Sequence, residues 1–210
     1  AAVGATTTLS NLIIGFLQGL SGGFAIIIAQ KFGAKDYKNV KKSFAMSLGM
    51  GTGIAIFFTV FGLLFLQPIL NILNVPSDLM ATAKSYIFVI IAGLVATFLY
   101  DACAAALRSL GDTVTPLVIL AISVALNIVG DLFVVVLKSG VRGAAIATVL
   151  AQAIAFVVCW IYMVKRYELL RLSREDFKDP NPVMVKNMLG AGMSMGFMSS
   201  LINIGSLTLQ

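Results

Sequence analysis

The sequence predicts an all-α protein, a polytopic bundle of membrane-spanning helices. Hydrophobic residues make up 59% of the 210 residues and charged residues only 11%, whereas a soluble domain carries about 25% charged residues. The apolar residues form long charge-free runs, and a helix needs roughly 20 mainly apolar residues to cross a bilayer. Because these runs are continuous and do not alternate, they predict helices, which satisfy their own backbone polar groups, and not a β-barrel.

Six apolar runs predict six spans. Five runs carry no charge, and the remaining one, at 85–107, is interrupted only by Asp101. The expected spans lie at about 5–29, 43–66, 84–107, 114–137, 143–164 and from 188 onward.

Turn residues mark several ends of these spans. The Gln-Pro pair at 67–68 should end the second span, and the Pro-Ser-Asp sequence at 76–78 is typical of a helix start. Asp112 is a candidate N-cap for the fourth span, with Pro116 tolerated in its first turn.

The basic residues fix the expected orientation. With alternating spans, one side of the membrane holds twelve Lys and Arg residues and the other only three. The richer side is predicted to be cytoplasmic, which places residue 1 outside. The net charge of +6 therefore belongs to short loops, so we expect a lipid bilayer and no nucleic acid as partner. The expected location is the cell membrane, as in the inner membrane of a bacterium.

The polar stretch 165–187 divides the chain. It could lie along the membrane surface as an amphipathic segment or link two bundles through the cytoplasm, and we favour the linker. The expected organisation is therefore five spans in 1–164, the linker, and the first helix of a second lobe in 188–210. Because the chain starts without Met in one apolar run and stops inside another, we expect it to be a fragment.

A carboxylate lies well inside the fourth predicted span. Asp131 follows the uncharged residues 113–130 and precedes the apolar residues 132–137. An ionised side chain near the centre of a membrane helix costs at least about 2.5–3.5 kcal/mol, so Asp131 needs a compensating partner or a use. Asn127 lies four residues earlier on the same helical face. The oxygens of this pair suit a proton or a hard cation such as Na+, and we expect no other metal and no cofactor.

Polar residues also occur in the neighbouring spans. Asp101 lies seven residues before Arg108, and it is either part of a transport path or a carboxylate satisfied by hydroxyls or a basic residue. Thr148 and Gln152 are four residues apart and share one side of the fifth span. The chain has no His and only two Cys, so neither a transition-metal centre nor a set of catalytic groups is expected.

Four segments resemble the multidrug and toxic compound extrusion (MATE) transporters. They read AQKFGAKD after the first span, ALRSLGDTVTP between the third and fourth, NIVGD in the fourth and GVRGAAIATVLAQ entering the fifth. In this order and spacing they are specific, and the resemblance covers essentially the whole chain. It implies a MATE-type N-lobe that lacks its first helix, followed by the start of the second lobe, so the chain resembles the second to seventh family helices.

The resemblance also implies a cation site. In family members that use an N-lobe site, Asp131 matches an Asp on the fifth family helix, and Asn127 matches the Asn one turn before it. Thr148 matches a hydroxyl on the sixth family helix. Asp101 falls where many relatives have Asn, and this departure adds a second titrating group.

The leading functional hypothesis is a secondary antiporter, monomeric when full length, that exports amphipathic or cationic small molecules in exchange for Na+ or H+. An alternative is a flippase for lipids or lipid-linked oligosaccharides of the same superfamily, although such proteins line their cavities with basic residues and the predicted spans contain none. A non-transporting membrane scaffold is a third reading, which would leave Asn127 and Asp131 unexplained. No catalytic constellation is present, so an enzyme is not expected.

Overall fold

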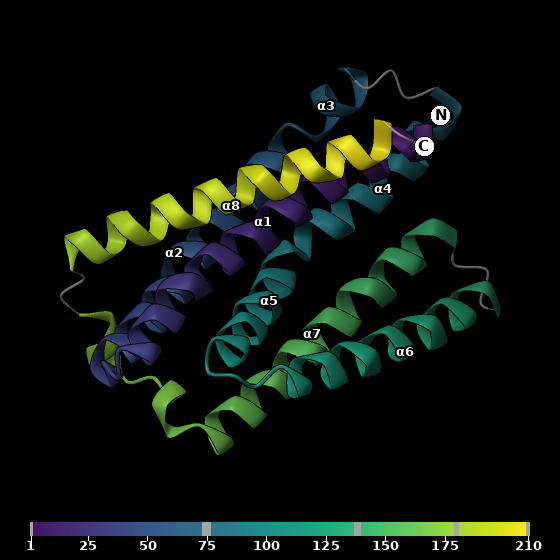
Figure 1. Cartoon of the computed structure of the whole chain (residues 1–210). Helices are drawn as coiled ribbons and strands as arrows, with labels where there is room; N and C mark the ends of the chain where they lie inside the picture. Colours follow the sequence, from purple (N-terminus) through teal and green to yellow (C-terminus); the bar gives the residue numbers. More distant parts are fainter. Residues whose placement is uncertain (1, 73–76, 137–139, 179–180, 209–210) are drawn as a thin grey trace.

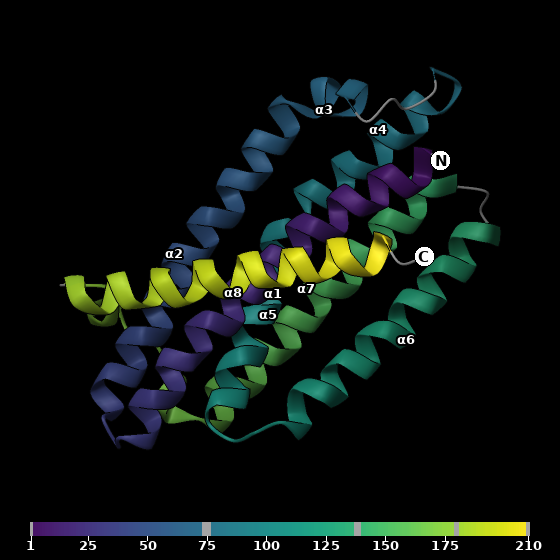
Figure 2. The ribbon, with the colours of Figure 1, turned by 45° about the horizontal axis from the view of Figure 1, so that its top comes forward.

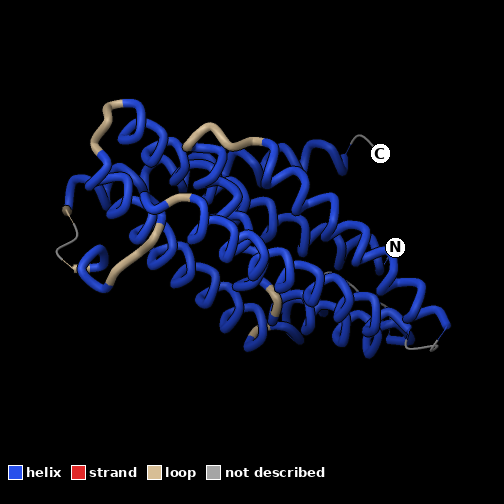
Figure 3. The backbone as a smooth tube through the Cα atoms, turned by 90° about the horizontal axis from the view of Figure 1, so that it is seen from below, coloured by secondary structure: helices blue, strands red, loops and turns tan. Residues whose placement is uncertain are grey.

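Helices contain almost all of the residues that the computed structural model describes, which are 2–72, 77–136, 140–178 and 181–208. No strand occurs within these ranges (Figure 3). The first half of the chain forms α1 (Ala2–Gly33), α2 (Tyr37–Leu64), α3 (Leu66–Ile72), α4 (Ser77–Ala92) and α5 (Leu94–Ser109). The second half forms α6 (Val114–Val136), α7 (Gly140–Arg166), the 3-10 turns η1 (Glu168–Leu170) and η2 (Arg174–Phe177), and α8 (Pro182–Thr208). The all-α prediction is confirmed.

Five of the six predicted spans are present by length and composition. In the described part of the chain, α1, α2, α6 and α7 are long and apolar enough to cross a membrane, and α4 with α5, bent by 41°, passes the same test as a pair and counts as the fifth when the pair is taken as one broken span. The sixth predicted span lies in α8, which has 27 residues. Its described residues contain no stretch as apolar as the other spans.

The end of α2 and the start of α8 differ from the prediction. The second span already ends at Leu64, and the Gln-Pro pair at 67–68 lies in the short α3, because Pro is tolerated in the first turn of a helix. α8 begins at Pro182 and not near 188, so the helix takes over the end of the predicted linker 165–187. The helix begins here because Asn181 caps it: the Asn181 side chain accepts a hydrogen bond from the Val183 amide at 3.0 Å. Pro182 occupies the first helical position, where proline is favoured.

The third predicted span is broken at Gly93, a bend that its continuous apolar sequence did not indicate. At this bend the chain lies directly against α7, where a Cβ on Gly93 would come within 2.4 Å of Val149. Only a residue without a side chain permits this approach, so Gly93 places α5 against α7.

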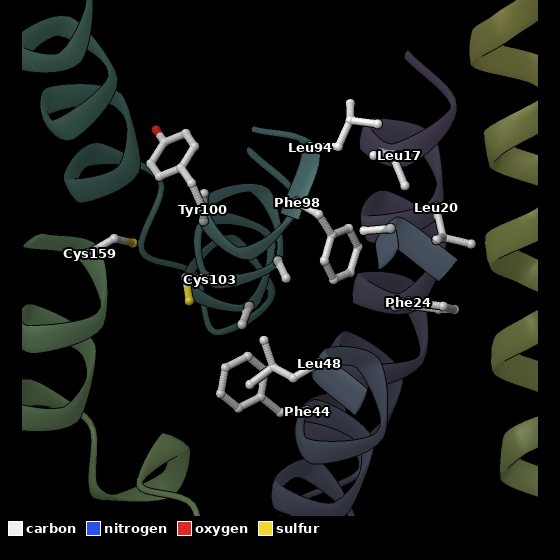
Figure 4. Close-up of a cluster of buried hydrophobic side chains, with 14 of the residues drawn as sticks. Leu17, Leu20, Phe24, Phe44, Leu48, Leu94, Phe98, Tyr100, Cys103 and Cys159 are labelled. Atoms are coloured by element: carbon white, nitrogen blue, oxygen red, sulfur yellow. The ribbon is translucent and has the colours of Figure 1, made fainter. Parts of the chain in front are cut away.

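The core lies where α1, α2 and α5 meet (Figure 4). Phe98 of α5 is fully buried, and its ring fills the space that a side chain at Gly51 of α2 would occupy. The largest fully buried side chains of these three helices are Leu17, Leu20, Phe24, Ile28, Phe44, Leu94, Phe98 and Leu107.

The helix α8 runs antiparallel along α1 (Figures 1 and 2). Ser200 donates a hydrogen bond to the Leu12 carbonyl, and Asn203 donates one to the Asn11 carbonyl. A Cβ on Gly19 or Gly23 would collide with the α8 backbone at 2.3–2.4 Å, so these glycines allow the two backbones to touch. The start of α1 and the end of α8 therefore lie at one end of the bundle.

The turn between α5 and α6 is fixed by Asp112. Its carboxylate caps α6 by accepting the Thr115 amide at 3.0 Å, and it also accepts the Tyr167 hydroxyl at 3.0 Å. Partial burial works to raise the pKa of Asp112, but these hydrogen bonds outweigh it and lower the pKa below its usual value of 3.8. Asp112 therefore joins the start of α6 to the segment after α7.

Replacing Phe98 with Ala should destabilise the bundle. The substitution leaves a cavity between α2 and α5, which costs about 3–5 kcal/mol, and thermal unfolding in detergent should show a clearly lower midpoint. Phe57 of α2 is 62% exposed, so Phe57→Ala is the matched control and should leave the midpoint almost unchanged. Equal effects of the two substitutions would contradict this packing.

Removing the Tyr167 hydroxyl should change the pH dependence of stability. In Tyr167→Phe the pKa of Asp112 should rise toward its usual value, with a loss of about 0.5–1.5 kcal/mol at neutral pH. Because a lowered carboxylate pKa stabilises the fold above the unfolded pKa and loses this effect in acid, the difference from wild type should shrink as the pH falls below the usual Asp pKa of 3.8. Unfolding measured between about pH 2 and pH 7 tests this. Tyr37 is 50% exposed, so Tyr37→Phe should leave the profile unchanged.

Candidate functional site

Two of the four predicted site residues are in direct contact. Asn127 of α6 donates a hydrogen bond from its side-chain nitrogen to the Thr148 hydroxyl of α7 at 3.0 Å. Thr148 in turn donates to the Ala144 carbonyl of its own helix at 3.1 Å. The proton of the hydroxyl is thus used within α7, and its oxygen remains an acceptor toward α6.

The helices α6 and α7 approach closely beside this contact. A Cβ on Gly130 would lie 2.8 Å from the Cβ of Ala147, so the helices touch at the residues next to Asp131 and Thr148. Two turns earlier on α6, Ser123 donates a hydrogen bond to the Ala151 carbonyl at 3.2 Å. The close contact and the two cross-helix bonds fix the polar face of α6 against α7.

Asp131 lies one turn beyond Asn127 and is half-buried. Its Oδ1 atom is buried and has no hydrogen-bond partner among the described residues, so Asp131 is not bonded through this atom to Asn127 or to Thr148. A buried polar atom without a partner costs about 1–3 kcal/mol, and more when it is charged. Asp131 therefore presents an acceptor oxygen that no other described residue uses.

Asp101 is the fourth predicted residue, and it faces the interior from α5. Its Oδ2 atom is also buried without a hydrogen-bond partner among the described residues, while the positive charge of Arg108 acts on the carboxylate through space. Asp101 and Thr148 line one cavity of about 120 Å³ between α1, α4, α5, α6 and α7. Asn127 and Asp131 are not part of its lining, so Thr148 is the residue common to both groups.

Gln152 was not among the predicted site residues, but it shares their environment. Its Oε1 atom is buried without a partner in the described ranges, as in the two aspartates, and the residue lines the same cavity as Asp101. The sequence contained one signal that could have identified Gln152: it lies four residues after Thr148, which puts both side chains on one face of α7.

The cysteines do not form a site with other metal-binding groups. Cys103 of α5 and Cys159 of α7 are free and buried, and they lie on facing sides of their helices (Figure 4). Within the described ranges, no three His, Cys, Asp or Glu residues lie together in a way that could hold a metal ion. A small cation would therefore be held by single carboxylates with neutral oxygens.

Comparison with known proteins decides the family. The family model described as MatE matches residues 1–133. The chain belongs to the MatE family. Members of this family are transporters, so the chain is a multi-pass membrane protein and not an enzyme, and the resemblance drawn from the sequence is confirmed.

Curated relatives in the MatE family are named as drug-resistance proteins. The chain is 30% identical over 198 residues to the probable multidrug resistance protein YpnP of Bacillus subtilis, covering 93% of this chain and 44% of that protein. It is 25% identical over 201 residues to the multidrug export protein MepA of Staphylococcus saprophyticus, covering 94% and 43%. The chain thus spans less than half the length of these relatives.

Solved MatE structures share the fold. An inward-facing multidrug resistance MATE family transporter superposes with a TM-score of 0.89 at 25% identity, covering 97% of this chain and 46% of that chain. An outward-facing structure superposes with a TM-score of 0.87 at 25% identity, covering 95% and 44%. The arrangement of these helices is therefore similar to both conformations.

Adding a methyl group at Gly130 should disturb the site. Gly130→Ala places a Cβ 2.8 Å from Ala147, so α6 must move away from α7 and the unfolding midpoint should fall. A Cβ on Gly49 of α2 would meet no atom within 4 Å, so Gly49→Ala should raise the midpoint by removing about 1 kcal/mol of glycine penalty. Thermal unfolding should therefore show a lower midpoint for Gly130→Ala and a higher midpoint for Gly49→Ala. A higher midpoint for both variants would contradict the close contact between α6 and α7.

Proposed function

We propose that this chain forms the cation-binding part of a secondary antiporter that exports amphipathic or cationic small molecules in exchange for Na+ or H+. The names of the multidrug resistance and export relatives support small molecules as cargo. The observation that carries the coupling is the buried Oδ1 of Asp131, which has no hydrogen-bond partner among the described residues and lies in the most apolar of the candidate spans. An apolar span keeps such a group at a cost that ion binding would offset.

The side chains around Asp131 have distinct proposed roles. Asp131 supplies the negative charge that a Na+ ion or a proton requires. Asn127 uses its nitrogen to bond Thr148, which leaves its carbonyl oxygen as a neutral ligand on the same helical face as Asp131. Thr148 holds Asn127 in this orientation, and its oxygen is a further neutral acceptor.

Coupling requires that the cation binds the two conformations of the transporter unequally. A shift from 1:99 to 99:1 between two conformations needs an affinity difference of about 10⁴-fold. A carboxylate inside an apolar helix can provide a large difference, because a small change in its access to water or neutral oxygens changes the stability of its charge. Asp131 is therefore the proposed coupling group.

Charge and topology suggest the cargo and the orientation. Asp101 and Asp131 are the carboxylates deep inside the spans, while basic residues lie mainly near the ends of the helices, which favours cationic cargo over lipid phosphates. The loop between α1 and α2, the turn between α5 and α6, and η1 lie at the end of the bundle away from the start of α1 (Figure 1). Because the basic residues concentrate there, we assign this end to the cytoplasm and the native protein to the cell membrane.

Replacing Asp131 with Asn should abolish ion-driven export. The substitution keeps the size of the side chain but removes its charge, so uptake of a cationic dye into everted vesicles that contain the full-length protein should fall more than about tenfold. Imposing Na+ and pH gradients separately identifies the coupling ion, since only one of them should drive wild-type export.

The matched control is Asp78→Asn, because Asp78 lies exposed in the first turn of α4. This variant should export dye at the wild-type rate. Equal amounts of each variant in the membrane are confirmed first. Unchanged export by Asp131→Asn would refute the assignment of Asp131.

A further inference from the structure

A long groove runs along the outward face of the helix pair α6 and α7. The helix α6 lies at the edge of the bundle beside α7 (Figures 1 and 2), and the groove that the two helices form has a volume of about 500 Å³. Its lining extends from Leu126 to Val134 on α6 and from Arg142 to Ile154 on α7. We refer to it as the α6–α7 groove.

The α6–α7 groove faces away from the interior of the bundle. Thr148 and Gln152 of α7 line the cavity beside Asp101, whereas Ile146 and Leu150 of the same helix line the groove. Residues two positions apart are separated by about 200° around a helix axis, so the two pairs lie on opposite faces of α7. Leu150 is 56% exposed. The groove therefore lies on the outside of this bundle.

Aliphatic residues make up almost all of the lining. Besides Arg142, the lining residues are Leu126, Gly130, Val134, Gly143, Ile146, Ala147, Leu150, Ala151 and Ile154. The glycines and alanines leave room between the larger side chains. Because none of these nine side chains has a polar atom, the groove suits a hydrocarbon chain.

The length of the groove matches one leaflet of a bilayer. Arg142 lies in the first turn of α7, which begins at Gly140, and Ile154 lies twelve residues further along, or about 18 Å at 1.5 Å per residue. Half of the hydrocarbon core of a bilayer is about 15 Å thick. Beyond Leu126 and Ile154, the same face holds a cavity of only about 10 Å³. The wide part of the groove therefore ends near the middle of the membrane.

A single positive charge stands at the end of the groove. Arg142 is the one charged residue among the described residues that line it. The Arg142 side chain is exposed, and it forms no hydrogen bond or ion pair with another described residue. A guanidinium has five N–H donors in a planar arrangement that matches two phosphate oxygens. This charge favours an anionic amphiphile as occupant and disfavours a cationic cargo molecule.

We propose that the α6–α7 groove binds one phospholipid with a net negative headgroup, such as phosphatidylglycerol. Arg142 binds the lipid phosphate at the membrane interface, and one acyl chain lies along the aliphatic lining as far as Ile154. α7 begins at the end of the bundle opposite the turn between α5 and α6 (Figure 1), so the proposed orientation places this lipid in the outer leaflet. The lipid site goes beyond the proposed antiport and does not require it.

Titration of the purified full-length protein with phosphatidylglycerol tests the proposal. Arg142→Gln removes the charge and keeps a long polar side chain, so native mass spectrometry should count one tightly bound lipid fewer than in wild type. The affinity at this site should fall at least about tenfold. Phosphatidylcholine has the same phosphate but no net charge, so wild type should bind it about tenfold more weakly at this site.

A second substitution tests the apolar part of the groove. Leu150→Trp places a larger side chain in the groove and keeps Arg142, so it should also remove the tightly bound lipid by obstructing the acyl chain. Thermal unfolding without added lipid confirms that each variant is folded. The midpoint of wild type should rise as phosphatidylglycerol is added, because a ligand that binds the native state stabilises it, and this rise should be smaller in both variants.

The matched controls carry similar changes away from the groove. Lys84→Gln removes a positive charge from an exposed residue of α4, and Leu117→Trp enlarges a residue of α6 that is 65% exposed. Neither residue lines the groove, so both variants should bind phosphatidylglycerol as wild type does. Asp131→Asn should do so as well, which separates this test from that of the proposed antiport.

Wild-type binding of phosphatidylglycerol by Arg142→Gln would overturn the lipid site, and so would equal binding of the two lipids by wild type. The absence of a tightly bound lipid in wild type would also overturn it. That last result is expected where another part of the full-length protein or a second copy covers the groove.

Discussion

The structure depends on one constraint: each buried polar atom needs a hydrogen-bond partner, and an apolar helix bundle contains few groups that can serve as one. Most polar groups of the apolar helices meet it locally, as Thr97 and Thr148 do by donating to a carbonyl one turn earlier. Three side chains do not: Asp101, Asp131 and Gln152 each bury an oxygen without a hydrogen-bond partner in the described part of the chain. Since all three are acceptors, a hydrogen-bond donor such as water or the proposed small cation would satisfy each of them.

Close helix packing places these acceptors. Within a bilayer, apolar side chains gain little by leaving lipid, so helices associate through close contact and hydrogen bonds across their interfaces. Gly93 brings α5 against α7, and Gly130 brings α6 against the other side of α7. Both α5 and α6 therefore pack against α7. Thr148 and Gln152, on one face of α7, lie beside polar groups of these two helices.

The sequence predicted the existence and type of the helices well, because long apolar runs leave few alternatives in a membrane. The start of α8 could also have been read from the capping residue Asn181, whereas the bend at Gly93 depends on contact with another helix. Within the site, the shared face of Asn127 and Asp131 follows from their spacing. The bond from Asn127 to Thr148 and the cavity beside Gln152 depend on how α7 is rotated against its neighbours, which the sequence of α7 alone does not specify.

The most direct test of the account is an infrared difference spectrum of the native protein in lipid, recorded as Na+ or H+ is exchanged for choline. Binding of a cation to buried aspartates predicts changes in the carboxyl and carboxylate bands that diminish in Asp131→Asn and disappear when Asp101 is also replaced by Asn. A spectrum without carboxyl changes on addition of either ion, from protein active in export, would contradict the account.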